Sequence, residues 1–283
     1  MLDETIYEEM INFFKELDLP DYKYLRNHEL ETLEKLRIEN KVLTHLPDAI
    51  THLKNLRILK LKNNNLTSLP DVITQLTNLK ELDIMNNNLT SLPDVITQLT
   101  NLKELILSHN NLTSLPDSLA TMEKLEFINI SNNNFTEVPP VLRKIQKLKR
   151  LAITENNIQE LPEFFTELFN LQGLIAYGNK ITELPDLTPL KKLRRLVFDD
   201  NKLTCIPAFI KNLKEIKSLH LENNLITELP DWFYEKHFDV LNIMNNPIPD
   251  LEAKMQLLRK NTRWVKDGGP EPMVRTNLFI PEG

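Results

Sequence analysis

The side chains that could take part in chemistry are few in this sequence. His109 and His220 are candidate metal ligands or proton carriers, and Asp199, Asp200 and Glu222 are close enough in a repeating fold to bind a divalent cation. The alternative for three carboxylates on a solvated face is that they are simply hydrated. The sequence contains no Gly-rich phosphate loop, no Cys-x-x-Cys pair and no His-Glu-x-x-His or Gly-x-Ser-x-Gly motif. We therefore expect no enzymatic activity, no metal and no cofactor.

A second polar set has a structural interpretation. Asparagines recur at nearly constant spacing, at Asn64, Asn87, Asn110, Asn133, Asn156, Asn179, Asn201, Asn224 and Asn246. A buried amide side chain can donate and accept hydrogen bonds at once, so such a row can satisfy backbone groups in buried turns. Lys41 stands at the corresponding position near the start, which suits a turn that still meets water.

The element that must position these side chains is a repeat. Residues 56–66 read L-x-x-L-x-L-x-x-N-x-L, and the same pattern begins at Leu33, Leu56, Leu79, Leu102, Leu125, Leu148, Leu171, Leu193, Ile216 and Phe238. Successive starts differ by 23 residues six times, then by 22, 23 and 22, and residues 63–82 and 86–105 are identical. A single unit of this size cannot bury its apolar face alone, so the period predicts a stack with one continuous core.

Each repeat is predicted to contribute one short strand and one return segment. In the second repeat the inward-pointing residues are Leu56, Leu59, Leu61, Leu66, Leu69, Ile73 and Leu76. The period-two alternation around Leu59 indicates a strand, and parallel strands stack about 4.8 Å apart. His109 and His220 are then five repeats, or roughly 24 Å, apart and cannot share a metal. Repeat seven has Pro185 and Pro189 in its return, which argues against a helix there.

The two ends lie outside the repeat. Residues 1–32 are predicted to form an N-terminal helical cap that starts at Asp3, is stopped by Pro20 and is followed by a second helical piece from Asp21 towards Leu30. A partner-binding or dimerising helix is the alternative. Residues 33–251 form the ten repeats. Residues 252–283 are predicted to form a capping helix with the apolar stripe Leu251, Met255, Leu258 and Trp264, and then an apolar tail that folds back on the last repeat or docks on another molecule.

The unit LxxLxLxxNxLxxLPxxIxxL resembles the intracellular, Ras-suppressor-type leucine-rich repeats and many bacterial leucine-rich-repeat proteins, over about three quarters of the chain. The resemblance implies an α/β fold: a right-handed leucine-rich-repeat solenoid, or horseshoe, with a parallel concave sheet and helical end caps. It also implies a protein-binding scaffold. Some bacterial members of this class are secreted effectors whose repeats choose a host target, and those with ubiquitin-ligase activity carry a separate catalytic domain with an essential cysteine. Cys205 lies on the turn side of repeat eight, so we expect no ligase activity.

Net charge and cysteine content limit the classes of partner and the cellular compartment that we expect. The net charge of −6 disfavours nucleic-acid binding. A single cysteine excludes an intrachain disulfide and favours a reducing compartment. The N-terminus has no signal-peptide pattern, and no run of about 18 apolar residues could span a membrane. We expect a cytoplasmic monomer, with a secreted effector that lacks a cleavable signal peptide as the alternative.

The candidate binding site lies on the strand positions that flank the buried leucines and should face solvent. The middle repeats place apolar residues there: Ile106, Phe127, Ala152, Ile175, Tyr177 and Val197. A grouped apolar set indicates a protein interface, whereas the competing explanation is that β-propensity alone favours such residues in strands. Early repeats are basic at these positions (Lys35, Arg37, Lys60, Lys62), and later ones are acidic. Another protein is therefore the expected partner; a glycan is the alternative, although only Phe127 and Tyr177 could act as stacking platforms.

Overall fold

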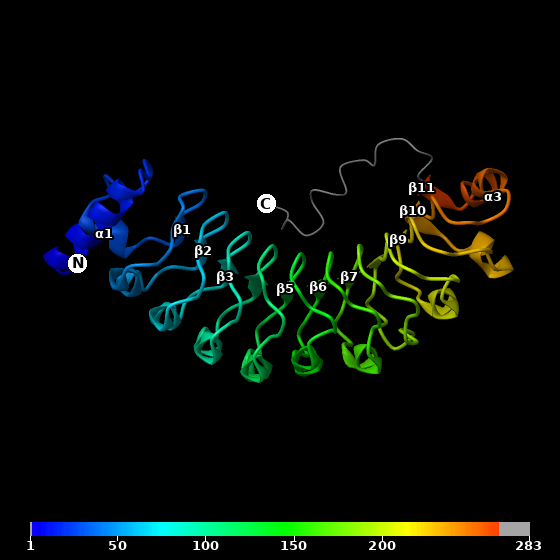
Figure 1. Ribbon diagram of the computed structural model, residues 1–283, viewed down its shortest axis with the longest axis horizontal. Coiled ribbons are helices and arrows are strands. Elements are labelled where there is room, and N and C mark those ends of the chain that lie inside the picture. The colour runs from blue at the N-terminus through cyan, green and yellow to red at the C-terminus, as the bar shows by residue number, and fades with distance from the viewer. Residues whose placement is uncertain (1, 266–283) are drawn as a thin grey trace. The chain divides into compact units, whose positions relative to one another are not determined.

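The computed structural model describes residues 2–265 (Figure 1). The chain divides into two compact units. The first unit comprises Met1–Phe135 and Pro139–Lys147, and the second comprises Thr136–Val138 and Leu148–Gly283. The predicted apolar tail after residue 265 lies outside the described residues.

The described part of the first unit contains two α-helices, five parallel strands and five short 3₁₀-helices. In chain order these are α1 (Glu4–Glu16), α2 (Asn27–Glu31), β1 (Lys35–Arg37), η1 (Asp48–His52), β2 (Ile58–Lys60), η2 (Asp71–Gln75), β3 (Glu81–Asp83), η3 (Asp94–Gln98), β4 (Glu104–Ile106), η4 (Asp117–Thr121), β5 (Phe127–Asn129) and η5 (Pro140–Lys144). Neighbouring strands pair in sequence order with a constant offset, so that Ile58 lies opposite Glu81 and Glu81 opposite Glu104.

The described part of the second unit continues the same alternation. Its elements are β6 (Arg150–Ala152), η6 (Glu163–Glu167), β7 (Gly173–Ile175), β8 (Arg195–Val197), η7 (Ala208–Asn212), β9 (Ser218–His220), η8 (Asp231–Glu235), β10 (Phe238–Asn242), α3 (Leu251–Leu258) and β11 (Thr262–Val265). All of its strand pairs are parallel and join successive strands.

The core of each repeat is the one that the leucine pattern predicts. In the second repeat Leu56, Leu59, Leu61 and Leu66 are fully buried, and Ile73 on the return is also fully buried. A short strand therefore faces a short return segment across a layer of aliphatic side chains. The predicted α/β repeat fold with parallel strands is confirmed.

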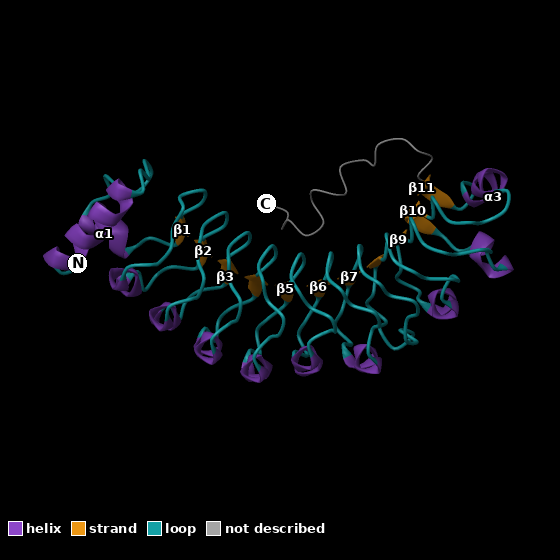
Figure 2. Ribbon diagram, in the orientation of Figure 1, coloured by secondary structure: helices purple, strands orange, loops and turns teal. Residues whose placement is uncertain are grey.

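The return segments follow from the Leu-Pro-Asp sequence. A proline precedes each 3₁₀-helix; Pro70, for example, has φ −70° and ψ 144°, an extended conformation suited to the residue before a helix. Asp71 then lies in the first turn, where a carboxylate is stabilised by the helix dipole. The return of repeat seven, between β7 and β8, has no helix among its described residues, as its two prolines predicted (Figure 2).

The N-terminal segment contacts the first repeat. Asp3 accepts a hydrogen bond from the Thr5 amide at 2.9 Å at the start of α1, and α1 contacts η1. The prediction of a second helix from Asp21 was wrong in extent, because residues 20–24 form turns and α2 spans only Asn27–Glu31. The first helix also ends before Pro20, at Glu16, where Asp18 takes φ 46° and reverses the chain.

The C-terminal helix is shorter than the predicted stripe. Met255 and Leu258 are buried on α3, as expected, but Trp264 belongs to a strand, β11, that pairs in parallel with β10. The prediction that extended the helical stripe to Trp264 was wrong. The reason is that the backbone of β10 leaves one edge open, and pairing with it satisfies hydrogen-bonding groups that a longer helix would leave unpaired.

One turn position carries a left-handed backbone in every repeat. The residue before each of the nine ladder asparagines, and Asn40 before Lys41, has φ between 48° and 66°; these residues are Asn40, Asn63, Asn86, His109 and Asn132 in the first unit and Glu155, Gly178, Asp200, Asn223 and Asn245 in the second. Asparagine, aspartate and glycine adopt this conformation at the lowest cost. This requirement explains the first asparagine of pairs such as Asn132-Asn133, which precedes the ladder asparagine.

Candidate functional site

The ladder asparagines hold neighbouring turns together. Asn133, buried in the first unit, donates from Nδ2 to the Leu107 and Ile130 carbonyls at 3.0 and 3.1 Å, and its Oδ1 accepts from the Leu112 amide at 2.9 Å. Asn179 makes the equivalent contacts in the second unit, with the Ile153 and Ala176 carbonyls. Each such side chain bridges its own turn and the turn of the preceding repeat. The ladder is thus a structural device, and its amides are occupied by backbone.

The outer strand face is the surface available for binding. We use this name for the three side chains of each strand region that point away from the core: those before, between and after the two buried residues. In the first unit it includes Ile106 on β4, which is half-buried, and Phe127 on β5, which exposes only 2% of its surface.

The second unit holds the other four predicted residues. Ala152, Ile175 and Val197 occupy the same register on β6, β7 and β8, so Ile175 lies between the other two. They expose 5%, 2% and 3% of their surfaces, respectively, whereas Tyr177, after β7, is half-buried.

The expectation that all six side chains face open solvent was therefore wrong for Phe127, Ala152, Ile175 and Val197. Parallel strands stand about 4.8 Å apart, so side chains at the same register on adjacent strands contact one another along the stack. This lateral contact is made between repeats, so the sequence of a single repeat does not predict it. Only Ile106 and Tyr177 of the predicted set keep a substantial accessible surface.

Charged residues on the outer strand face of the first unit are paired. Lys60 Nζ lies 2.6 Å from Glu81 Oε1, and Lys62 Nζ lies 3.5 Å from Glu39 Oε2. The basic start predicted from Lys60 and Lys62 is therefore offset by neighbouring carboxylates. Asp83 is buried on the same face, and its burial raises the pKa of its carboxyl, although the Met85 amide and the two lysines act in the opposite direction.

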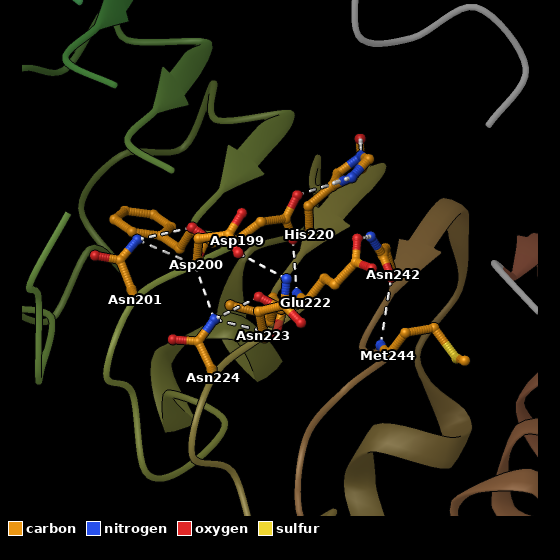
Figure 3. Close-up of polar contacts among 12 residues, drawn as sticks. Asp199, Asp200, Asn201, His220, Glu222, Asn223, Asn224, Asn242 and Met244 are labelled. Carbon is orange, nitrogen blue, oxygen red and sulfur yellow. Dashed lines mark hydrogen bonds and ion pairs between the residues drawn. The ribbon is translucent and has the colours of Figure 1, made fainter. Parts of the chain in front are cut away.

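The outer strand face of the second unit carries a polar network around His220 (Figure 3). The Ser218 hydroxyl lies 2.9 Å from Nε2 of His220, and Nδ1 of His220 lies 3.9 Å from Oδ2 of Asp199. His220 and Asp199 are buried, at 2% and 6% exposure. His220 and Asp199 were candidates from the sequence, whereas Ser218 was missed, although Ser218 and His220 lie on β9 and Asp199 follows the adjacent strand β8.

Serine, histidine and aspartate are the residues of the catalytic triad found in many hydrolases. Whether these three residues could act as a triad depends on the distances between them. The histidine–carboxylate distance of 3.9 Å is too long for the hydrogen bond that would orient the imidazole. The Ser218 amide, a usual donor to a developing oxyanion, donates to the Arg194 carbonyl at 3.0 Å in the strand ladder. The arrangement fits a hydrogen-bonded binding surface better than a nucleophilic site.

The carboxylates considered for metal binding have other partners. Asp199 Oδ1 accepts from the Glu222 amide at 2.6 Å, Glu222 Oε2 accepts from Asn242 Nδ2 at 2.8 Å, and Asp200 Oδ1 accepts from Asn223 Nδ2 at 2.6 Å (Figure 3). Within residues 2–265, no three histidine, cysteine, aspartate or glutamate side chains come together in a way that could hold a metal ion. In the same described range, no helix is long and apolar enough to cross a membrane.

Comparison with known proteins identifies the repeat. A family model described as leucine rich repeat matches residues 31–89 and 77–135. The solved leucine-rich-repeat protein LIC12759 of Leptospira interrogans is 31% identical, with 84% of this chain and 73% of that chain covered and a TM-score of 0.64. This chain belongs to the leucine-rich-repeat family.

Two further solved leucine-rich-repeat structures are similar. The ectodomain of the Arabidopsis thaliana receptor kinase GASSHO1/SCHENGEN3, solved in complex with CASPARIAN STRIP INTEGRITY FACTOR 2, is 31% identical, with 76% of this chain and 27% of that chain covered and a TM-score of 0.63. The functional domain of InlJ from Listeria monocytogenes, which includes a cysteine ladder, is 29% identical over 82% of this chain and 48% of that chain, with a TM-score of 0.66. A search of curated proteins gave no match.

Proposed function

We propose that this leucine-rich-repeat chain is a non-catalytic scaffold and that a protein partner docks on its outer strand faces. The observation that carries the proposal is the placement of Ile106 and Tyr177, which are half-buried on the outer strand faces and keep accessible surface there. Aromatic side chains at such positions often dominate the energy of an interface. The complex of the GASSHO1/SCHENGEN3 ectodomain with its named factor supports a protein or peptide as the ligand class.

The six predicted residues then divide into two roles. Ile106 in the first unit and Tyr177 in the second contact the partner directly. Phe127 lies on β5 opposite Glu104 of β4, the strand that carries Ile106, and is part of the buried surface beside it. Ala152, Ile175 and Val197 form a buried apolar layer within the second unit.

The test is a binding titration of the tagged chain with a partner captured from cell extract. Tyr177→Ala should weaken binding by about 2 kcal/mol, because a central aromatic contact is lost. Its melting temperature should stay close to that of the unmodified protein, because the ring is outside the core. Tyr24→Ala is the matched control: Tyr24 is 79% exposed and lies outside the strands, so its removal should leave binding unchanged.

Two outcomes would redirect the proposal. If Tyr177→Ala and Ile106→Ala both bind the partner as the unmodified chain does, the outer strand faces are not the docking surface. If capture is abolished by glycosidase treatment and not by protease treatment of the extract, the ligand is a glycan.

We also infer that the protein works as a monomer in a reducing compartment, the cytoplasm. Cys205 is free and exposed, which suits an environment in which thiols stay reduced. Cell fractionation together with light scattering of the purified chain tests both statements. Recovery of the native chain in the culture supernatant would instead favour the secreted-effector alternative.

A further inference from the structure

The irregular return of repeat seven leaves a hollow in the second unit. Pro185 and Pro189 lack amide hydrogens, and the repeat is one residue shorter than most, so residues 183–192 form no 3₁₀-helix. The segment is fixed by other means: Leu187 and Leu190 are fully buried, and Asp186 Oδ1 accepts from the Thr188 amide at 2.9 Å. One flank of the next helix, η7, therefore faces a tight loop in place of another helix.

A pocket of about 520 Å³ occupies this position. Its apolar part includes Leu203 and Phe209, which are almost fully buried, and Ala208, which is exposed at the start of η7. Its polar part includes the exposed side chains of Glu183 and Asp186. The volume falls within the range of pockets that bind small ligands or single side chains of a partner.

The charge of the pocket has one sign. Glu183 and Asp186 are its ionisable carboxyl groups, and its lining residues include no lysine, arginine or histidine. The Thr188 hydroxyl near Asp186, together with the Thr188 amide that donates to it, holds the pKa of Asp186 below its ordinary value, so this carboxyl is ionised at neutral pH. A cationic group next to an apolar one would complement this lining, and arginine pairs with carboxylates in a well-defined geometry.

The pocket also has an extension. A second hollow, of about 410 Å³, shares Thr182 and Glu183 with the first and continues towards Glu160 of the preceding repeat. Lys180 and Lys202 also line this second hollow, so its charge is mixed and the acidic part of the site is the end formed by Glu183 and Asp186. A ligand that fills both must be elongated. A peptide of a few residues meets this condition, and its side chains alternate along its length.

We propose that this hollow, the repeat-seven pocket, binds a short peptide segment of a protein partner that presents an apolar side chain beside an arginine or lysine. The apolar side chain lies against Leu203 and Phe209, and the cation lies between Glu183 and Asp186. This site is on the return side of the repeats and does not depend on docking at the outer strand faces.

Cys205 provides a direct test, because it is the sole cysteine of the chain, is exposed and lines the pocket. The rate of its modification by N-ethylmaleimide, an uncharged reagent, is measured by mass spectrometry on the full chain. The probe is the blocked peptide acetyl-Leu-Arg-Leu-amide, and its matched control is acetyl-Leu-Glu-Leu-amide. By mass action, the basic peptide should slow modification about threefold at twice its dissociation constant. The acidic peptide should leave the rate unchanged.

Three variants locate the effect. Ala208→Trp fills the pocket from an exposed position and should abolish protection, whereas Asp117→Trp, at the equivalent first residue of η4, should retain it. The double variant Glu183→Gln with Asp186→Asn should lose the preference for the basic peptide. Fluorescence anisotropy of a dye-labelled basic peptide repeats these comparisons without using the thiol. Equal protection by both peptides, protection that survives Ala208→Trp, or no protection up to the solubility limit of the peptide would overturn the proposal.

Discussion

At the scale of single residues, the two adjacent asparagines of a turn serve different physical needs. Asn132 takes φ 52°, and asparagine suits this position because its backbone tolerates the left-handed region. Asn133 is buried, and asparagine suits this position because its side-chain amide both donates and accepts hydrogen bonds. The same residue type is therefore selected twice in succession, once for its main chain and once for its side chain.

The ladder role of Asn133 gives the first stability prediction. Asn133→Ala should lower the free energy of unfolding by about 1–3 kcal/mol, because buried backbone groups lose their partner. Asn134→Ala is the control; Asn134 is exposed, so the change should stay within about 0.5 kcal/mol. Urea melts of the three proteins make the comparison, and coincident curves for Asn133→Ala and the unmodified chain would refute the ladder's contribution to stability.

Gly178 is the one glycine among the left-handed turn positions, and a side chain there would meet Glu155. A Cβ atom built on Gly178 would lie 2.5 Å from Cδ of Glu155. Gly178→Ala should cost about 1–2 kcal/mol, mainly because φ is +66°. Repeating the substitution in a Glu155→Ala background separates the two causes in thermal melts: an unchanged cost assigns the effect to the backbone, and a cost that disappears shows that the Glu155 carboxylate was the obstacle.

The buried carboxyl of Asp83 predicts a pH dependence. Its pKa is raised in the folded state, above all by burial, so its contribution to stability is fully present below the ordinary value of 3.8 and is lost as the pH rises through the folded-state pKa. Asp83→Asn should therefore raise the melting temperature at neutral pH. Asn129, at the same position of repeat five, already accepts a hydrogen bond from the amide two residues on, as Asp83 does, so the substitution keeps that contact.

The measurement is the difference in melting temperature between Asp83→Asn and the unmodified protein from pH 7 down to pH 3. The difference should shrink as the pH falls. A variant that is less stable at neutral pH would mean that the Lys60 and Lys62 charges outweigh burial.

At the scale of elements, the α1 helix closes the first repeat by burying its own apolar face. Met10 and Phe14 are fully buried, and the Phe14 and Tyr22 rings lie 5.4 Å apart. The helix contacts η1, so it covers residues that would otherwise form an open apolar end. Terminal repeats generally require such a cover to remain soluble.

Deletion of residues 1–32 should accordingly reduce solubility and promote association of the chain. Light scattering and the soluble fraction after centrifugation report the result. Where the truncated chain is recovered only as aggregate, Phe14→Ala offers a milder test, with an expected cost of about 3–5 kcal/mol. A truncated protein that stays monomeric and equally stable would identify residues 1–32 as an appendage, and the partner-helix alternative would gain support.

At the scale of the whole molecule, the sequence pattern predicts the structural features that recur in every repeat and misses features that occur only once. The period of 23 places strands, core leucines and ladder asparagines at the residue level, because each is required by the same local geometry in every repeat. The loss of the return helix in repeat seven was also predictable from Pro185 and Pro189. In contrast, β11 has no repeat signature, and it forms only because β10 offers it a backbone to pair with.

The candidate site was harder to predict for a related reason. Burial of Ile175 depends on its lateral neighbours Ala152 and Val197, and the contact between Ser218 and His220 depends on two side chains that share one face of a strand. Neither contact follows from the charge or polarity of one strand position taken alone. The left-handed turn position could have been found from its residue types, since Asn, Asp and Gly recur there.

The constant register of β2, β3 and β4 has a consequence for the gene. Ile58 lies opposite Glu81 and Glu81 opposite Glu104, at intervals of 23 residues, and the segments 63–82 and 86–105 are identical. An unequal crossover between the coding copies of these segments removes or adds one whole unit while preserving the reading frame. Lateral contacts within the identical segments then join the same residue types as before, whereas the strand position after them changes, as from Asp83 to Ile106 opposite Lys60. Chain length can thus evolve by whole repeats without passing through an unfolded ancestor.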